Sequence, residues 1–185
     1  YRPVELFNLV ETDTPVISRA FYDSGYYVMR YDDHVLIFDC GPIGMKGVQL
    51  STHGHSDLLS FTLSVHGMPL IVDIGSGTYT ENKALHDYFR STVGHNTVTV
   101  DGKDQCGLSK IWTVNQHPRY WLIDWRTSPE RDFVSGGHDG YHPLIHKREI
   151  VMRKLPEPEI RIRDELIGAE EHEMVARFHL HPDVT

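Results

Sequence analysis

Histidine and carboxylate side chains are concentrated between Gln49 and Gln105 of this 185-residue chain. The run HGHSD places His53 and His55 two residues apart, and Asp73 and His95 each lie beside a strand-like run. Three neighbouring strands can bring His55, Asp73 and His95 to one point. Two imidazoles and one carboxylate, with a water in the fourth position, suit Zn²⁺. The sequence indicates a candidate zinc site, although spacing alone leaves open that these are surface or core histidines.

The same stretch contains groups that can move protons or bind a sugar carboxylate. Tyr79 and Tyr88 are candidate catalytic phenols, because neighbouring cations can lower the pKa of a tyrosine. The alternative is that each is a packed aromatic with a solvated hydroxyl. Arg90 is a candidate for substrate binding, or it forms an ion pair with Asp87 or Glu81.

The two histidines of HGHSD need not have the same role. If the segment is extended, both imidazoles project from one face of a strand. His53 is then either a proton-transfer or carboxylate-binding group, or a further metal ligand beside His55. Asn96 is a candidate substrate-binding residue, but Asn96 and Asp57 can also orient the metal ligands. Histidines elsewhere, such as His146, are interpreted as ordinary structural residues.

Composition excludes several classes of function. Hydrophobic residues make up 39% and charged residues 24%, as in ordinary globular domains. The formal net charge of −8 argues against non-specific binding of nucleic acid. A polyanionic ligand would therefore need a local basic patch. No apolar run has the length of a membrane span. Cys40 and Cys106, the only cysteines, can be paired, free or buried.

Short alternating segments separated by turn residues predict an all-β fold, an antiparallel β-sandwich with one short helix at residues 82–91. A hairpin is expected over residues 25–39, with Asp32-Asp33 at its turn. A second is expected over residues 58–74, with His66-Gly67 at its turn and a buried second strand. Residues 136–140 are interpreted as a glycine-rich loop. The other expected strands are 97–100, 110–115, 120–126, 132–135, 146–154, 159–167 and 173–180.

The stretch between Gln49 and Gln105 also carries a family resemblance. The run HGHSDLLSFTLSVHGMPLIVDIGSGTYT, followed by DYFRSTVGHNTVTVDGKDQ, resembles the heparinase II/III-like polysaccharide lyases. The matching pattern is HxHxD, then D-x-G after an apolar hairpin, then RST-x-x-HNTV-x-VDG. These motifs cover less than a third of the chain, and the flanking strand pattern is compatible with the β-sandwich domain of that family.

The resemblance implies a bacterial enzyme that cleaves an acidic, uronate-containing polysaccharide by β-elimination. It implies a bound Zn²⁺, with His55, Asp73 and His95 at the ligand positions and His53 at the position of the active-site histidine. It also implies a periplasmic or extracellular location and an α-helical toroid before the sandwich. We therefore expect residues 1–185 to be one domain of a longer protein, and nearly inactive when isolated.

Two other functions remain open at this stage. The chain can be a non-catalytic sandwich that binds carbohydrate or keeps the zinc for structural reasons. It can also be a zinc-dependent hydrolase, because two histidines and one aspartate leave an open coordination position. The substrate is open as well, with glycosaminoglycans, alginate and bacterial exopolysaccharide as candidates.

Overall fold

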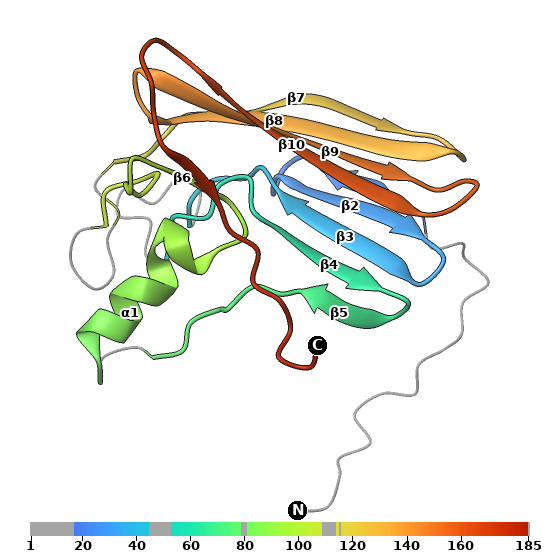
Figure 1. The fold of residues 1–185 in the computed structure, drawn as a ribbon, viewed down its shortest axis with the longest axis horizontal. Coiled ribbons are helices and arrows are strands. Elements are labelled where there is room, and N and C mark those ends of the chain that lie inside the picture. The colour runs from blue at the N-terminus through green and yellow to red at the C-terminus, as the bar shows by residue number, and fades with distance from the viewer. Residues whose placement is uncertain (1–16, 45–52, 79–80, 109–113, 115, 185) are drawn as a thin grey trace, which may run out of the picture.

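The computed structural model describes residues 17–44, 53–78, 81–108, 114 and 116–184. In this part of the chain, two antiparallel sheets face one another, and a two-stranded ribbon and one α-helix lie at one end (Figure 1). The predicted antiparallel β-sandwich with one short helix is therefore confirmed. The strand expected at 110–115 falls largely outside the described residues.

The first sheet has five strands: β1 (Arg19–Phe21), β2 (Tyr26–Tyr31), β3 (His34–Asp39), β4 (Phe61–Val65) and β5 (Met68–Ile71). Its order follows the chain, so that each strand pairs with the next. Both predicted hairpins are confirmed, with left-handed turn residues at Asp32 (φ 46°) and at His66 and Gly67 (φ 51° and 72°). These conformations give the tight reversals that join antiparallel neighbours.

The edge strand β5 differs from its prediction. The apolar run predicted a buried strand, but β5 contains only exposed and half-buried residues. Its position at the end of the five-stranded sheet leaves its side chains with fewer neighbours than those of the inner strands, and only the C-terminal segment lies along its outer side. His179 accepts a hydrogen bond from Val72 N–H at 2.9 Å through its carbonyl, and His181 N–H donates to the carbonyl of Leu70 at 3.0 Å.

The second sheet has the order β10–β9–β8–β7. Its strands are β7 (Tyr120–Thr127), β8 (Arg131–Tyr141), β9 (Leu144–Arg153) and β10 (Glu159–Ile167). The prediction of a loop at 136–140 is wrong, because these residues continue β8. A Cβ placed on Gly136 would stand 2.7 Å from the sulfur of Cys40, and one on Gly137 would stand 2.9 Å from the indole of Trp121. The glycines make room for neighbouring side chains and do not mark a turn.

The main hydrophobic core lies between the two sheets. Alternation along each strand sends one side chain in two toward the opposite sheet. Tyr27 and Met29 of β2 face inward in this way, with 2% and 0% exposure. The other buried members of the core are Leu36, Phe38, Cys40, Leu59, Phe61, Leu63, Val134, Ile150 and Met152.

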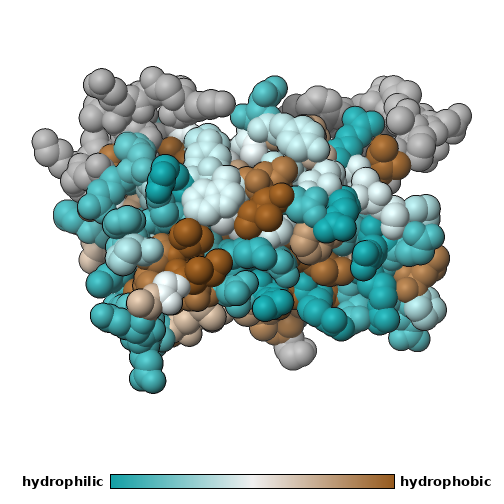
Figure 2. Space-filling view, turned by 90° about the horizontal axis from the view of Figure 1, so that it is seen from above, coloured by the Kyte–Doolittle hydropathy of each residue, from teal (hydrophilic) through white to brown (hydrophobic). Residues whose placement is uncertain are grey.

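The outer face of the second sheet is mostly hydrophilic (Figure 2), in contrast to the apolar face that packs against the first sheet. Figure 2 looks onto this face and shows hydrophilic side chains with smaller apolar areas between them. Ion pairs form here between neighbouring strands or along one strand, such as Arg153–Glu159 at 2.7 Å and Lys147–Glu149 at 2.7 Å. None of the described helices is long and apolar enough to cross a membrane.

The end of the sandwich near the candidate site is covered by α1 (Lys83–Arg90), a 3₁₀ turn at Thr92–Gly94, and the ribbon of β6 (Val98–Val100) with β11 (Met174–Ala176) (Figure 1). Asn82 caps α1 by accepting a hydrogen bond from Leu85 N–H at 3.0 Å. The helix buries His86 and Arg90, whereas Leu85 and Tyr88 are exposed. The last expected strand, 173–180, is shortened to β11.

Candidate metal and catalytic site

Residues 53–60 connect the first part of the chain to β4, and they form turns instead of an extended strand. His53 and Leu59 both have left-handed backbone conformations, with φ values of 65° and 59°. The expectation that His53 and His55 share a strand face is therefore wrong. Both residues nevertheless line one small pocket of about 20 Å³, next to Arg90 and Ser76.

Hydrogen bonds to the end of α1 give this segment its bent shape. Ser56 N–H donates to the carbonyl of Arg90 at 2.8 Å, and its hydroxyl contacts the hydroxyl of Thr92 at 2.8 Å. Arg90 is 4% exposed and donates from Nε to the carbonyl of Gly54 at 3.1 Å. Arg90 thus contacts the loop that carries the histidines, and its predicted role in substrate binding stays a prediction.

The imidazoles of His55 and His95 face each other across this loop. His55 Nδ1 lies 3.2 Å from His95 Nε2. The remaining nitrogen of each ring has a different partner: Ser76 Oγ lies 3.3 Å from His55 Nε2, and a carboxylate oxygen of Asp73 lies 2.7 Å from His95 Nδ1. Two ring nitrogens with lone pairs available to a metal can therefore converge on one point.

The donor set fits a zinc ion. Two nitrogens bound to one tetrahedral zinc, each about 2.0–2.1 Å from it, would stand about 3.3 Å apart. The observed separation of 3.2 Å between His55 and His95 matches this value. Asp57 completes a group in which one ligand atom from each residue lies within 4.8 Å of the others.

Two carboxylates, those of Asp57 and Asp73, are thus candidates for the third metal ligand. Asp57 shares the group with both histidines, whereas Asp73 makes a hydrogen bond to the far nitrogen of His95. A contact of 2.7 Å is typical of a charge-assisted hydrogen bond. The structure thus shows Asp73 in contact with the far nitrogen of His95, and the predicted ligand set of His55, Asp73 and His95 stays a prediction.

The electrostatics of the group favour neutral imidazole at His55. Burial, together with the neighbouring charge of His95, lowers the pKa of His55 to about 4. Burial also disfavours the charged form of His95, but its hydrogen bond to Asp73 and the charge of Asp57 outweigh this and raise the pKa of His95. Burial raises the pKa of Asp57 to about 6. A cation in the group would stabilise the charged carboxylate and the neutral rings that metal binding requires.

One acidic residue near the group has no counterpart among the candidates from the sequence. Asp39 ends β3, and burial and the charge of Asp57 raise the pKa of its carboxyl to about 7. The carboxylate of Asp39 accepts a hydrogen bond from Gly41 N–H at 2.8 Å and, with burial, raises the pKa of Tyr26 to about 12. Its position at a strand end before a Gly-Pro loop is the sequence signal that could have suggested it.

Asn96 joins three separate segments of the chain. It is fully buried, and its amide nitrogen donates to the carbonyls of Phe61 and Val72, both at 2.9 Å. Its side-chain oxygen accepts from His179 N–H at 2.7 Å. These contacts support the orienting role considered for Asn96, because the side chain holds the segment that follows His95.

The candidate catalytic residues occupy different environments. His53 is exposed at the rim of the small pocket. Tyr88 is 44% exposed on α1, with its ring 5.9 Å from that of Phe89, and it is not among the described residues that line the pocket. Tyr79 lies outside the described residues. The structure therefore brings His53 to the metal group and leaves the two phenols as predictions.

The fold is similar to that of solved polysaccharide lyases. A heparan sulfate lyase, HepC from Pedobacter heparinus, matches with a TM-score of 0.74 and 20% identity over 93% of this chain and 25% of that chain. A Heparinase III, the BT4657 gene product, matches with a TM-score of 0.66 and 22% identity over 85% of this chain and 23% of that chain. The chain thus spans about a quarter of the length of these enzymes.

A search of curated proteins finds no match. The family model described as "Heparinase II/III-like, C-terminal" matches residues 13–185, which includes both sheets, α1 and every residue of the histidine–carboxylate group. The sandwich topology and the facing histidines are consistent with this match. The chain belongs to the heparinase II/III-like C-terminal family.

Proposed function

We propose that this chain is the sandwich domain of a polysaccharide lyase that cleaves a uronate-containing polysaccharide by β-elimination, with a zinc ion that organises the site. The observation that carries the proposal is the convergence of His55, His95 and a carboxylate next to His53, in a chain of this family. The zinc would be held by the two imidazoles and by Asp57 or Asp73.

β-Elimination sets three chemical requirements. The proton on C5 of the uronate must be removed, the negative charge that develops on the neighbouring carboxylate must be neutralised, and the oxygen leaving C4 must be protonated. His53 is exposed at the rim of the same pocket as the half-buried His55, a position from which it would donate to the substrate carboxylate or move a proton. A bound zinc would supply positive charge and rigidity to the loop that carries His53.

The small size of the pocket among the described residues supports a substrate cleft that extends beyond this chain. Its volume of about 20 Å³ is far below the roughly 300–1,000 Å³ of small-molecule sites. We therefore propose that a second domain of a longer protein, an α-helical toroid before the sandwich, supplies the rest of the cleft and its basic groups. A periplasmic or extracellular enzyme is part of the same proposal.

The test is an assay of the full-length protein on a panel of acidic polysaccharides. Heparan sulfate comes first because a structural neighbour is a heparan sulfate lyase, followed by alginate and bacterial exopolysaccharide. Elimination produces an unsaturated uronate that absorbs in the ultraviolet, and hydrolysis produces new reducing ends without this absorbance. The expected result is ultraviolet-absorbing product from the full-length protein and almost none from residues 1–185. New reducing ends without absorbance would identify a hydrolase and contradict the proposal.

A second candidate is a sandwich that holds metal without catalysing a reaction. The same small pocket favours it, because the described residues alone form no sugar-sized cavity there. Binding of polysaccharide by the full-length protein with no product of either kind would support this candidate over the lyase.

A further inference from the structure

We propose that Arg148 is a positioning residue for the metal group: its buried guanidinium fixes the two backbone segments that carry the metal ligands. This inference rests on the proposed metal site, but its residue lies outside that site, on β9 of the opposite sheet. Arg148 is 0% exposed and is the largest of the fully buried side chains among the described residues.

One nitrogen of Arg148 contacts both ligand-bearing segments. Its terminal nitrogen Nη1 donates to the carbonyl of Leu59 at 2.8 Å and to the carbonyl of Asn96 at 2.6 Å. Leu59 is two residues after Asp57, and Asn96 directly follows His95. The guanidinium therefore sets the distance between the backbone that presents Asp57 and the backbone that presents His95.

The guanidinium is itself held in place from β10. Arg148 donates from Nε and from Nη2 to the two carboxylate oxygens of Asp164, at 2.7 and 2.9 Å. This two-point contact fixes the plane of the guanidinium, which a single-point contact would not do. The cation also lies 5.6 Å from the centre of the Phe61 ring.

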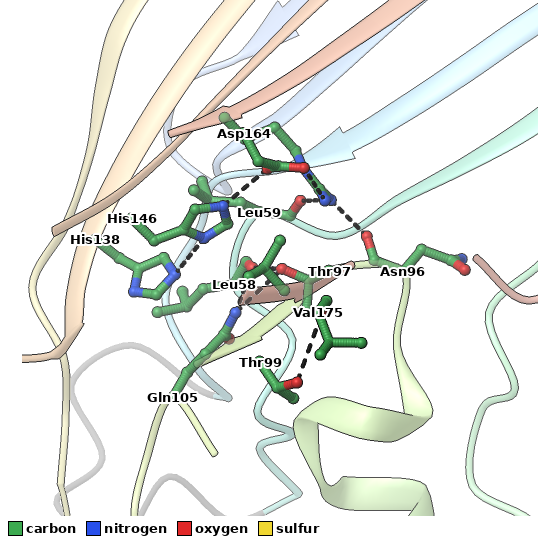
Figure 3. Close-up of polar contacts among 12 residues, drawn as sticks. Leu58, Leu59, Asn96, Thr97, Thr99, Gln105, His138, His146, Asp164 and Val175 are labelled. Carbon is green, nitrogen blue, oxygen red and sulfur yellow. Dashed lines mark hydrogen bonds and ion pairs between the residues drawn. The ribbon is translucent and has the colours of Figure 1, made fainter. Parts of the chain in front are cut away.

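Two histidines complete the support of Asp164. Figure 3 shows His138, His146 and Asp164 in a chain of contacts: His138 Nε2 lies 3.0 Å from His146 Nδ1, and His146 Nε2 lies 2.8 Å from a carboxylate oxygen of Asp164. The other ring nitrogen of His138, Nδ1, accepts a hydrogen bond of 3.1 Å from Gly140 N–H. Because each member has a partner on both sides, the anchor of Arg148 has little freedom to rotate.

One of the two carbonyls that Arg148 binds, that of Leu59, belongs to a residue in an uncommon conformation. Leu59 has φ 59°, which a non-glycine residue adopts only where its surroundings hold it there. The preceding carbonyl, of Leu58, is held as well: it accepts hydrogen bonds from Thr97 Oγ1 at 2.8 Å and from Gln105 Nε2 at 3.0 Å (Figure 3). The bend after Asp57 therefore depends on buried donors. Thr97 connects it to the segment of His95 through its own hydroxyl, and Arg148 connects the two from the opposite sheet by donating to Leu59 and to Asn96.

A matched ion pair in the same sheet allows this role to be separated from general stabilisation. Lys154, directly after the last residue of β9, forms a buried ion pair at 2.8 Å with Asp132 of β8. The hydroxyl of Ser18, just before β1, donates a hydrogen bond of 2.5 Å to Asp132 and so links this pair to the first sheet. The contacts of this pair among the described residues do not include the segments of His55, Asp57 or His95. Its loss should lower stability without affecting the metal.

The experiment measures metal binding by four forms of the full-length protein: unsubstituted, Arg148→Met, Asp164→Asn and the control Lys154→Met. Zinc affinity is determined by competition with a chelator, and the visible absorption of the Co²⁺-loaded protein reports the ligand geometry. Melting temperatures of metal-free protein give the stability of each form. Asp164→Asn retains Arg148 but weakens its anchor, so it provides a result if Arg148→Met does not fold.

We expect Arg148→Met to weaken zinc binding about 10–100-fold, as loss of groups that orient metal ligands usually does. Asp164→Asn should change affinity in the same direction, and both should alter the Co²⁺ spectrum. Lys154→Met should melt earlier with unchanged zinc affinity and spectrum. Unchanged affinity and spectrum in the folded Arg148 and Asp164 variants, or an equal loss in Lys154→Met, would overturn the inference. If the unsubstituted protein binds no zinc, the proposed metal site fails, and the inference fails with it.

Discussion

His95 is held between two different partners, and its contact with Asp73 determines which ring nitrogen is available. A carboxylate oxygen of Asp73 lies 2.7 Å from Nδ1 of His95, so that Nε2 is the nitrogen facing His55. A hydrogen bond between a carboxylate and the far nitrogen of a metal-binding histidine is a common way to fix the ring and its tautomer.

Replacement of the two competing carboxylates should identify the third ligand. If Asp57 is the ligand, Asp57→Asn should lose nearly all zinc at purification, because a charged donor is removed from the group. Asp73→Asn should retain zinc with an affinity about 10–100-fold weaker, because His95 keeps a neutral hydrogen-bond partner. Zinc content by elemental analysis and affinity by chelator competition test both. The opposite pattern would identify Asp73 as the ligand and support the set predicted from the sequence.

The neighbouring histidines should respond differently to alanine substitution in the full-length enzyme. His55→Ala removes a metal ligand, so it should lower zinc content, melting temperature and activity together, because the binding energy of the metal is linked to folding. His53→Ala should keep zinc and melting temperature and lower the rate of unsaturated-uronate formation by about 10²–10⁴. Early melting and loss of zinc in His53→Ala would show that His53 is a ligand. Full activity of His53→Ala would show that His53 is not needed for the reaction, and Tyr79 and Tyr88 would then be the next residues to substitute.

Acid stability should depend on Asp164. Burial alone would raise the pKa of Asp164, but hydrogen bonds from His146 and Arg148 outweigh it and lower the pKa from 3.8 to about 2. A pKa that is lowered in the folded state contributes stability above the unfolded value, and this contribution is lost as pH falls from about 4 through about 2. The shift corresponds to about 2 kcal/mol.

The measurement for this prediction is the free energy of unfolding from urea titrations between pH 6 and pH 2, in the unsubstituted chain and in Asp164→Asn. The variant should start less stable and lose less stability over the acid range. Glu157→Gln, which alters an exposed carboxylate, serves as the control and should retain the full acid loss. Parallel curves for the unsubstituted chain and Asp164→Asn would contradict the assignment.

Both cysteines should be inert in the folded protein. Cys40 and Cys106 are free thiols with 3% exposure each. Burial raises the pKa of Cys40 to about 12, with a further contribution from Asp39, and burial raises the pKa of Cys106 to about 11. Because the thiolate is the reactive form, a colorimetric thiol reagent should react with neither cysteine in buffer and with both in urea. Rapid reaction of the native protein would show that one of these sites opens readily.

The two hairpins could be predicted from local sequence, because their turn residues and their alternation of apolar and polar side chains lie within a few residues of one another. Asp32 and His66-Gly67 occupy the predicted reversals, and Tyr27 and Met29 face the core as the pattern indicates. Gly136 could not be assigned correctly in this way. The reason for a glycine there is the space taken by Cys40 and Leu59, which come from a distant part of the chain.

The candidate site was predictable to a similar extent. The HGHSD run and the motif around His95 indicated the histidines, but not the turn conformation of His53 that places it beside His55 in one pocket. Arg148 had no visible signal, because in the sequence it is one charged residue in an alternating strand. Its role depends on pairing with β10 and on facing the other sheet, which local patterns do not specify.

The long separation of Arg148 from its partners has a consequence for biosynthesis. Its contacts with Leu59 and Asn96 span 89 and 52 positions of the chain, and the anchor Asp164 is made later still. Contacts of such high sequence separation form slowly, and a growing chain orders its early part first. We therefore expect the ribosome to expose all the metal ligands well before the fold can fix their spacing. The nascent protein would reach a zinc-retaining state only after β9 and β10 have emerged and docked, so metal capture is a late event in its maturation.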